Sequence, residues 1–301
     1  MFNAENKKAY LNNTTIQWDD KENFKQFMEF LFDKSTPAEK QHKKDVAFFN
    51  IGEIMELYQD FHSSSLPYLT RVHGYYRDYA QFINPDKHNY GDLTGKMLGM
   101  CVDKDNERSR IIMRKELLEE MEVIRNPFEK ALILGLFEGI RRIDFMDLTA
   151  DDIGDNVVHL KGRKDLTISP QLTKILREAA NTYSIIPHTD DPRFDHPRYT
   201  ELDPDDNHVI KSMNNANNTD RGVRIRMILC KARDFYGFPW ISASSLPQCG
   251  AANMLLDLKA KHPEKKIEDI VDENINDIRS RYSSSWKYAG TFVQKFGHLF
   301  K

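Results

Sequence analysis

Apolar residues at helical spacing dominate the first 84 residues. The first such run begins at Lys21 and has apolar side chains three or four positions apart (Phe24, Phe27, Met28, Leu31 and Phe32). A second run follows Asn50, and a third follows the serines at 63–65, which are residues that favour helix starts. Pro37 follows a Ser-Thr pair and predicts a further helix start. We therefore expect residues 1–84 to form a small all-helical domain.

The next segment, residues 85–96, is rich in turn formers and predicts a linker. Beyond it, Asn126-Pro127-Phe128-Glu129 combines a capping Asn, a Pro at the first helical position and a Glu at the capping-box position. Residues 157–169 predict two short strands around a Gly-Arg-Lys turn. Residues 97–301 are thus expected to form a second, mostly helical domain. The predicted fold class is mainly α with a small antiparallel β-sheet.

Composition narrows the functional classes only slightly. The chain has 301 residues and a net charge of -3, so it lacks the overall basic character of many nucleic-acid binders, although one basic face would be enough. Its three cysteines lie far apart, which predicts reduced thiols and no metal site, and no sequence feature indicates a cofactor. We find neither a signal peptide nor a membrane-spanning run in the sequence, and we expect a cytoplasmic protein that does not contact a membrane.

One segment carries a family signature. Residues 139–148 read Gly-Ile-Arg-Arg-Ile-Asp-Phe-Met-Asp-Leu and are followed by Asp151-Asp152-Ile153. This segment resembles the first signature box of the tyrosine recombinases (phage integrases), in which Arg141 would be the first catalytic arginine. The hairpin at residues 157–170 resembles the lysine-bearing turn of that family, with Lys161 as the lysine. The predicted helical domain of residues 1–84 is similar to the family's core-binding domain.

The resemblance fails where the rest of the catalytic set should be. The second box of the family has a histidine and, three residues later, an arginine; here Ser244 and Pro247 occupy those positions. The third box is also missing, and the nearest alignment places Thr291 at the nucleophile position, with Tyr282 and Tyr288 out of register. Loss of one transition-state donor typically costs about 100- to 1,000-fold in rate. We therefore predict a protein that is not an enzyme, with no catalytic residues, on a tyrosine-recombinase-like fold.

The function that would remain is binding to double-stranded DNA at operator sites. Basic residues of the first box and the hairpin would hold phosphates, and an Asn- and Arg-rich stretch would lie where the family places a helix facing the major groove. In the first domain, Arg71, Tyr75 and Arg77 would meet the opposite side of the duplex. The predicted DNA contacts in the second domain are Arg141, Lys161, Arg163, Lys164, Asn217, Asn218, Arg221 and Arg224. The apolar final helix, residues 286–300, predicts docking in cis or self-association.

Each of these residues also has a plain structural interpretation. Arg141 could pair with Asp144 or Asp147, the lysines could lie on a solvated hairpin tip, and the Asn-rich stretch could simply cap a helix. Two other functions also stay open. One is an active, divergent recombinase that uses Tyr282 or Tyr288. The other is a protein-interaction module that kept the fold, which the net charge and the acidic segment at 190–206 would suit.

Overall fold

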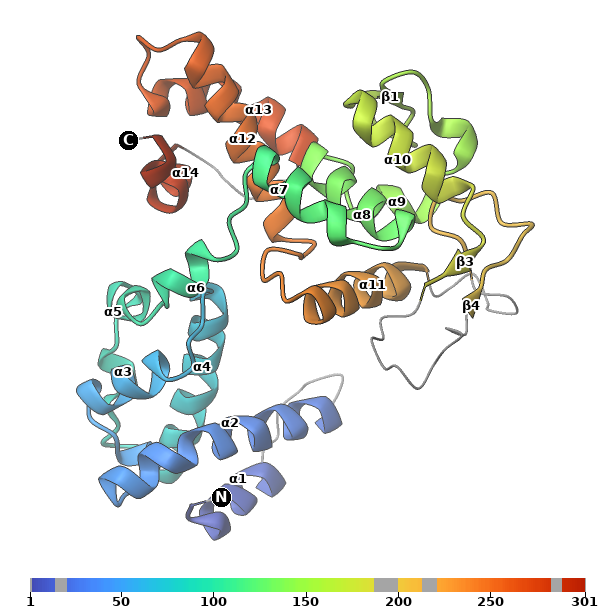
Figure 1. Ribbon diagram of the computed structural model, residues 1–301. Helices are drawn as coiled ribbons and strands as arrows, with labels where there is room; N and C mark the ends of the chain where they lie inside the picture. Colours follow the sequence, from blue (N-terminus) through green and yellow to red (C-terminus); the bar gives the residue numbers. More distant parts are fainter. Residues whose placement is uncertain (1, 14–20, 187–199, 213–220, 283–288, 301) are drawn as a thin grey trace. The chain divides into compact units, whose positions relative to one another are not determined.

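The computed structural model describes residues 2–13, 21–186, 200–212, 221–282 and 289–300, and the chain divides into two compact units, residues 1–108 and 109–301 (Figure 1). The first unit is helical throughout the part that the structure describes. Its elements are α1 (Ala4–Asn13), α2 (Lys21–His42), η1 (Val46–Phe48), α3 (Ile51–Gln59), α4 (Leu66–Ile83), η2 (Asn89–Asp92), α5 (Gly95–Met100) and α6 (Lys104–Arg108).

Helix α2 continues through Pro37, so the predicted new helix start at that residue is wrong. Leu31 and Phe32 before the proline are buried, and so are Ala38 and Glu39 after it. Because both halves are fixed in one core, packing outweighs the loss of one backbone hydrogen bond at the proline.

Tyrosines of α4 hold the first unit together. The Tyr76 hydroxyl donates to the Leu31 carbonyl at 2.5 Å, and the Tyr79 hydroxyl donates to Asp45 Oδ2 at 3.0 Å. Both rings are fully buried. A buried hydroxyl needs such a partner, because an unmade hydrogen bond in the core is costly.

Residues predicted to be a linker belong to this first core. Tyr90 is buried and donates its hydroxyl to the Val46 carbonyl at 2.9 Å, and Leu93 is buried in the same core. The first unit accordingly extends past the predicted boundary at residue 84 and includes 85–96. The buried side chains of Tyr90 and Leu93 anchor this segment to the core of the first unit.

The second unit combines short and long helices with two small antiparallel strand pairs. Its helices are α7 (Arg114–Glu120), η3 (Met121–Val123), α8 (Pro127–Glu138), α9 (Asp144–Asp147), η4 (Ala150–Asp152), α10 (Pro170–Ala180), α11 (Arg221–Tyr236), α12 (Ser245–Lys261), α13 (Ile267–Tyr282), α14 (Ala289–Phe296) and η6 (Gly297–Phe300). Its strands are β1 (Val157–Val158), β2 (Leu166–Thr167), β3 (Ser184–Ile185) and β4 (Thr200–Glu201).

Helix α8 forms the centre of the second unit, with α10, α11 and α12 packed against it (Figure 1). Apart from Lys130, every residue from Phe128 to Glu138 is buried, which explains why the helix is largely apolar on all sides. Asn126 occupies the cap position but does not cap with its side chain. Its amide instead accepts from the Ile186 backbone N–H at 2.8 Å and donates to the Ile186 carbonyl at 3.1 Å. The predicted capping role is thus replaced by a tertiary contact.

The predicted hairpin is present. Strands β1 and β2 pair antiparallel, with Val157 opposite Thr167 and Val158 opposite Leu166. Strands β3 and β4 form a second antiparallel pair, with Ser184 opposite Glu201 and Ile185 opposite Thr200. The prediction of a mainly helical chain with a small antiparallel sheet is confirmed.

The final helix, α14, packs on α12 and α13 of the same chain. Phe292 and Phe296 are fully buried there, and their rings stack at a centroid distance of 5.2 Å. Their neighbours include Leu255 of α12 and Ile278 of α13. Among the residues that the structure describes, the apolar face of the predicted 286–300 helix is therefore covered by other helices of the same chain.

Candidate nucleic-acid interface

The candidate site begins at the sharp turn that ends α8. Gly139 adopts a left-handed conformation with φ of 100°, which is readily available to glycine and ends the helix. Arg141 lies two residues after this glycine, and its backbone N–H donates to Asp144 Oδ2 at 2.8 Å. The Arg141 guanidinium also contacts Asp144, with Nη2 2.9 Å from Oδ1 and Nε 3.1 Å from Oδ2. Arg141 is one-third exposed, so one edge of the guanidinium stays open to a ligand.

Asp144 binds a second arginine that comes from the hairpin tip. Arg163 Nη1 lies 2.6 Å from Asp144 Oδ2, and its Nη2 donates to the Ser280 carbonyl at the end of α13. Gly162, with φ of 76°, provides the tight turn that brings Arg163 inward. One carboxylate thus joins the end of α8, the hairpin and α13.

The two arginines also change the pKa of that carboxylate. Burial by itself would raise the pKa of Asp144, but hydrogen bonds from the side chain and backbone of Arg141, together with the charge of Arg163, lower this pKa below its usual value. Two cations against one anion leave the cluster with a net positive charge.

We expect Asp144→Asn to lower the free energy of unfolding of the second unit by about 3 kcal/mol, because removing one partner of a buried ion pair leaves the other charge unpaired. Chemical denaturation measures this loss. The matched control is Asp155→Asn, which removes the exposed partner of Arg177 and should change stability much less.

The same comparison has a pH signature. The folded pKa of Asp144 lies below its unfolded value, so its contribution to stability is complete above the unfolded pKa and is lost as pH falls through the folded one. The difference between the wild type and Asp144→Asn should therefore shrink in acid. An equal difference across the acid range would show that the carboxylate charge is not what stabilises the cluster.

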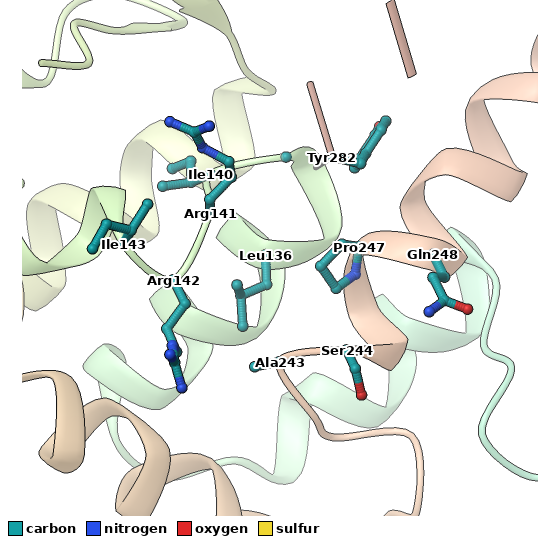
Figure 2. A pocket seen from close by; sticks show the side chains of 11 residues that line it. Leu136, Ile140, Arg141, Arg142, Ile143, Ala243, Ser244, Pro247, Gln248 and Tyr282 are labelled. Atoms are coloured by element: carbon teal, nitrogen blue, oxygen red, sulfur yellow. The ribbon is translucent and has the colours of Figure 1, made fainter. Parts of the chain in front are cut away.

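Beside Arg141 lies a cavity of about 360 Å³ (Figure 2). Ser244 and Pro247, from the start of α12, line it together with Arg141 and Tyr282. These are the residues that the sequence alignment placed at the family's second box, and the fold brings them to the first arginine. Neither a serine nor a proline supplies a cation to a phosphate.

Tyr282, at the end of α13, is almost fully buried at the wall of this cavity. Its ring lies against Gly250 of α12, where an added Cβ would be 2.9 Å from Cε1. Burial raises the pKa of Tyr282, which disfavours the phenolate that a nucleophile would need. Thr291, at the aligned nucleophile position, lies in α14.

The hairpin lysines are exposed. Lys161 and Lys164 flank the turn, and in the part of the chain that the structure describes neither has an ion-pair partner. An ion pair of His159 with Asp165, at 3.0 Å, lies at the base of the same turn. Both lysines are therefore free to meet a phosphate.

The arginines at the start of α11 point inward. Arg221 is 9% exposed and donates to Asp206 Oδ2 at 3.0 Å and to the Met146 carbonyl at 2.9 Å. Arg224 donates to the Lys211 carbonyl. Both anchor α11 to the preceding segment. Asn217 and Asn218 lie outside the described residues.

In the first unit the predicted residues lie on the outer side of α4. Arg71 stacks on the Phe27 ring at 5.4 Å, and Tyr75 packs edge-on against the same ring at a centroid distance of 5.4 Å. Arg77 is half exposed beside Asp78. A guanidinium stacked on rings still presents its N–H edge, so Arg71 is already positioned for a phosphate contact.

Two features of these surfaces were not predicted from the sequence. Arg142 lines the cavity beside Arg141, although the family box treats its position as variable. Phe30 is exposed and stacks with Phe27 at 6.2 Å, extending the aromatic surface of α2. The three-residue spacing of the two phenylalanines was the only available signal.

No cluster of three or more His, Cys, Asp or Glu side chains is arranged to hold a metal ion in the parts of the chain that the structure describes. Among the described helices, none combines the length and the apolar character needed to cross a bilayer.

Comparison with known proteins supports one part of this interpretation. No curated protein matches the chain. Residues 1–85 match a family model described as "MrpR, N-terminal core-binding domain". The first unit is thus similar to the core-binding domain of MrpR, and that similarity is consistent with a DNA-binding regulator.

Proposed function

We propose that this chain is a sequence-specific DNA-binding regulator on a tyrosine-recombinase-like fold, that it does not cut DNA, and that it acts as a transcriptional repressor. The chain resembles the master lysis repressor of SPbeta-type prophages (MrpR/YopR), and the match of residues 1–85 supports that resemblance. The proposed role is maintenance of lysogeny by binding operator sites on prophage DNA within the bacterial nucleoid.

One observation carries the proposal. The cavity that contains Arg141 also contains Ser244 and Pro247, where a recombinase would place a proton donor and a second arginine. Each missing transition-state donor costs about 100- to 1,000-fold in rate. Phosphate-binding cations remain at the site while the groups that break the phosphodiester bond do not.

Two measurements on the full chain test the proposal. Selection from a pool of random DNA duplexes should enrich a sequence motif, and fluorescence anisotropy should show preference for that motif at about 150 mM salt, near physiological ionic strength. The absence of any preference would contradict sequence-specific binding. A nicked duplex that traps covalent recombinase intermediates should give no adduct.

The positive charge of the hairpin should strengthen DNA binding without changing which DNA sequence the protein prefers. Lys161→Gln with Lys164→Gln is expected to reduce the slope of log affinity against log salt by about 2, because each lost phosphate contact releases about one counterion fewer. The enriched motif should stay the same. The matched control is Lys115→Gln with Lys174→Gln, two exposed lysines elsewhere in this unit, which should leave the slope unchanged.

One observation favours a second candidate function, that of a divergent active recombinase. Tyr282 lines the same cavity as Arg141. This alternative predicts a covalent adduct on the nicked duplex that disappears in Tyr282→Phe. An adduct of that kind would replace the repressor proposal with an enzymatic one.

The interaction-module alternative needs a charge-reversal test. Reversal of Arg141 would also break its pair with Asp144, so loss of function in that variant would be ambiguous. Lys161→Glu with Lys164→Glu reverses the DNA-facing charge and leaves the Asp144 cluster intact. If every activity survives this change, the hairpin surface is irrelevant to function.

A further inference from the structure

The cavity beside Arg141 has room and apolar wall for more than a phosphate group. Its volume of about 360 Å³ falls within the range of pockets that hold small organic molecules. Much of its wall is apolar and comes from the end of α8 and the start of α12, through Leu136, Ile140, Ala243 and Pro247. The phosphate groups of a DNA backbone have no apolar surface to bury against these side chains.

Cationic groups lie at the edge of this apolar wall. Arg141 and Arg142 leave the turn after α8 in opposite directions (Figure 2). Arg142 is exposed and, among the residues that the structure describes, has no hydrogen-bond or ion-pair partner. Its charge is therefore available to an anion, whereas that of Arg141 is partly neutralised by Asp144.

A further donor comes from α12. Gln248 lines the cavity, and Lys295 Nζ donates to its Oε1 at 2.6 Å. Because Lys295 fixes the amide oxygen, the amide N–H groups of Gln248 are left as donors toward a ligand. The cavity thus combines an apolar body with polar groups that favour negative charge.

We infer that this cavity binds a small amphipathic anion, an apolar ring or short chain that carries a phosphate or carboxylate. Its apolar part would lie against Ile140, Ala243 and Pro247, and its charge would meet Arg142. This inference concerns a ligand other than DNA and does not depend on the proposed function.

Naphthyl phosphate is a suitable probe, since it joins a flat apolar body to a dianion. Isothermal titration of the full chain should give a dissociation constant below about 1 mM. Inorganic phosphate, which lacks the apolar body, should bind at least about tenfold more weakly. Equal binding of the two compounds would overturn the inference, as would no binding of naphthyl phosphate up to about 10 mM.

Two variants test the location. Arg142→Gln should weaken naphthyl phosphate about tenfold, as expected for loss of a charged hydrogen bond, while Arg226→Gln, at an exposed arginine of α11, should not. Ala243→Phe should fill the cavity and abolish binding. In wild-type protein the methyl resonances of Ile140 and Ile143 should shift on titration while those of Ile270, in α13, stay fixed. Unshifted Ile140 and Ile143 methyls would overturn the inference even if Ala243→Phe does not fold.

Discussion

Replacement of Gly250 by alanine is expected to destabilise the second unit by about 3 kcal/mol, near the upper end for overpacking in a core. Gly250 lies where α12 crosses α8, and a Cβ at this position would be 1.7 Å from the Phe137 carbonyl oxygen. It would also be 2.9 Å from the Tyr282 ring. The backbone oxygen cannot rotate away, so the two helices would have to separate. Urea denaturation monitored by tryptophan fluorescence measures the loss.

The matched control for this variant is Gly74→Ala. Gly74 lies inside α4, and a Cβ there would meet nothing within 4 Å. That variant should gain about 0.5–1 kcal/mol, because alanine loses less backbone entropy than glycine in a helix. If Gly250→Ala proved as stable as the wild type, the close crossing of α8 and α12 would be wrong, and with it the shape of the cavity beside Arg141.

The second large effect is expected in the first unit, at a fully buried ion pair. Lys7 Nζ lies 2.5 Å from Glu39 Oε2, and both side chains are inaccessible to solvent. The other oxygen of Glu39 accepts from the Val46 backbone N–H at 2.9 Å. Lys7→Ala would leave this carboxylate without its cation, and we expect a loss of about 3–5 kcal/mol in the free energy of unfolding.

Controls for Lys7→Ala are available in the same helix. Lys8 is exposed, and Lys8→Ala should be close to neutral. Lys7→Met with Glu39→Gln removes both charges but keeps an oxygen for Val46, so it should recover much of the loss. A double variant as unstable as Lys7→Ala would show that the cost comes from lost packing and not from an unpaired charge.

The pH dependence of Lys7→Ala provides a further check. Burial already raises the pKa of Glu39, although hydrogen bonds from Lys7 and Val46 oppose the shift. Without Lys7 the folded pKa should rise further above the unfolded one, so the stability of the variant falls as pH rises between these two values. The deficit relative to the wild type should be smaller at about pH 5 than at about pH 7.

A count of basic residues in a sequence can overstate the positive charge that a surface offers to DNA. Three paired arginines show this, namely Arg141, Arg163 and Arg221. Asp144 holds the first two, and Asp206 holds the third. Hydrogen bonds from His208 and Ser212 outweigh the effect of burial and lower the pKa of Asp206, which favours the charged carboxylate that pairs with Arg221. The freely exposed cations of the second unit, by contrast, include Lys161, Lys164 and Arg142.

Local sequence patterns are enough to predict much of the fold of this protein. The three- and four-residue spacing predicted the helices of residues 21–84, and the Gly-Arg-Lys turn predicted the hairpin. The lack of a His-x-x-Arg motif was also a property of the sequence alone, and it carries the proposal that the chain does not cut DNA. These features depend on residues a few positions apart, where sequence spacing and spatial distance agree.

Only the tertiary structure decided which charges pair and which core each segment joins. Arg163 contacts Ser280, and Asn126 contacts Ile186; neither partner could be chosen from spacing. Residues 85–108 belong to the first unit because Tyr90 and Leu98 are buried in its core. The cavity likewise forms between the end of α8 and the start of α12, which are distant in sequence. Such contacts depend on how whole helices pack against each other, and the spacing of residues along the sequence does not determine that packing.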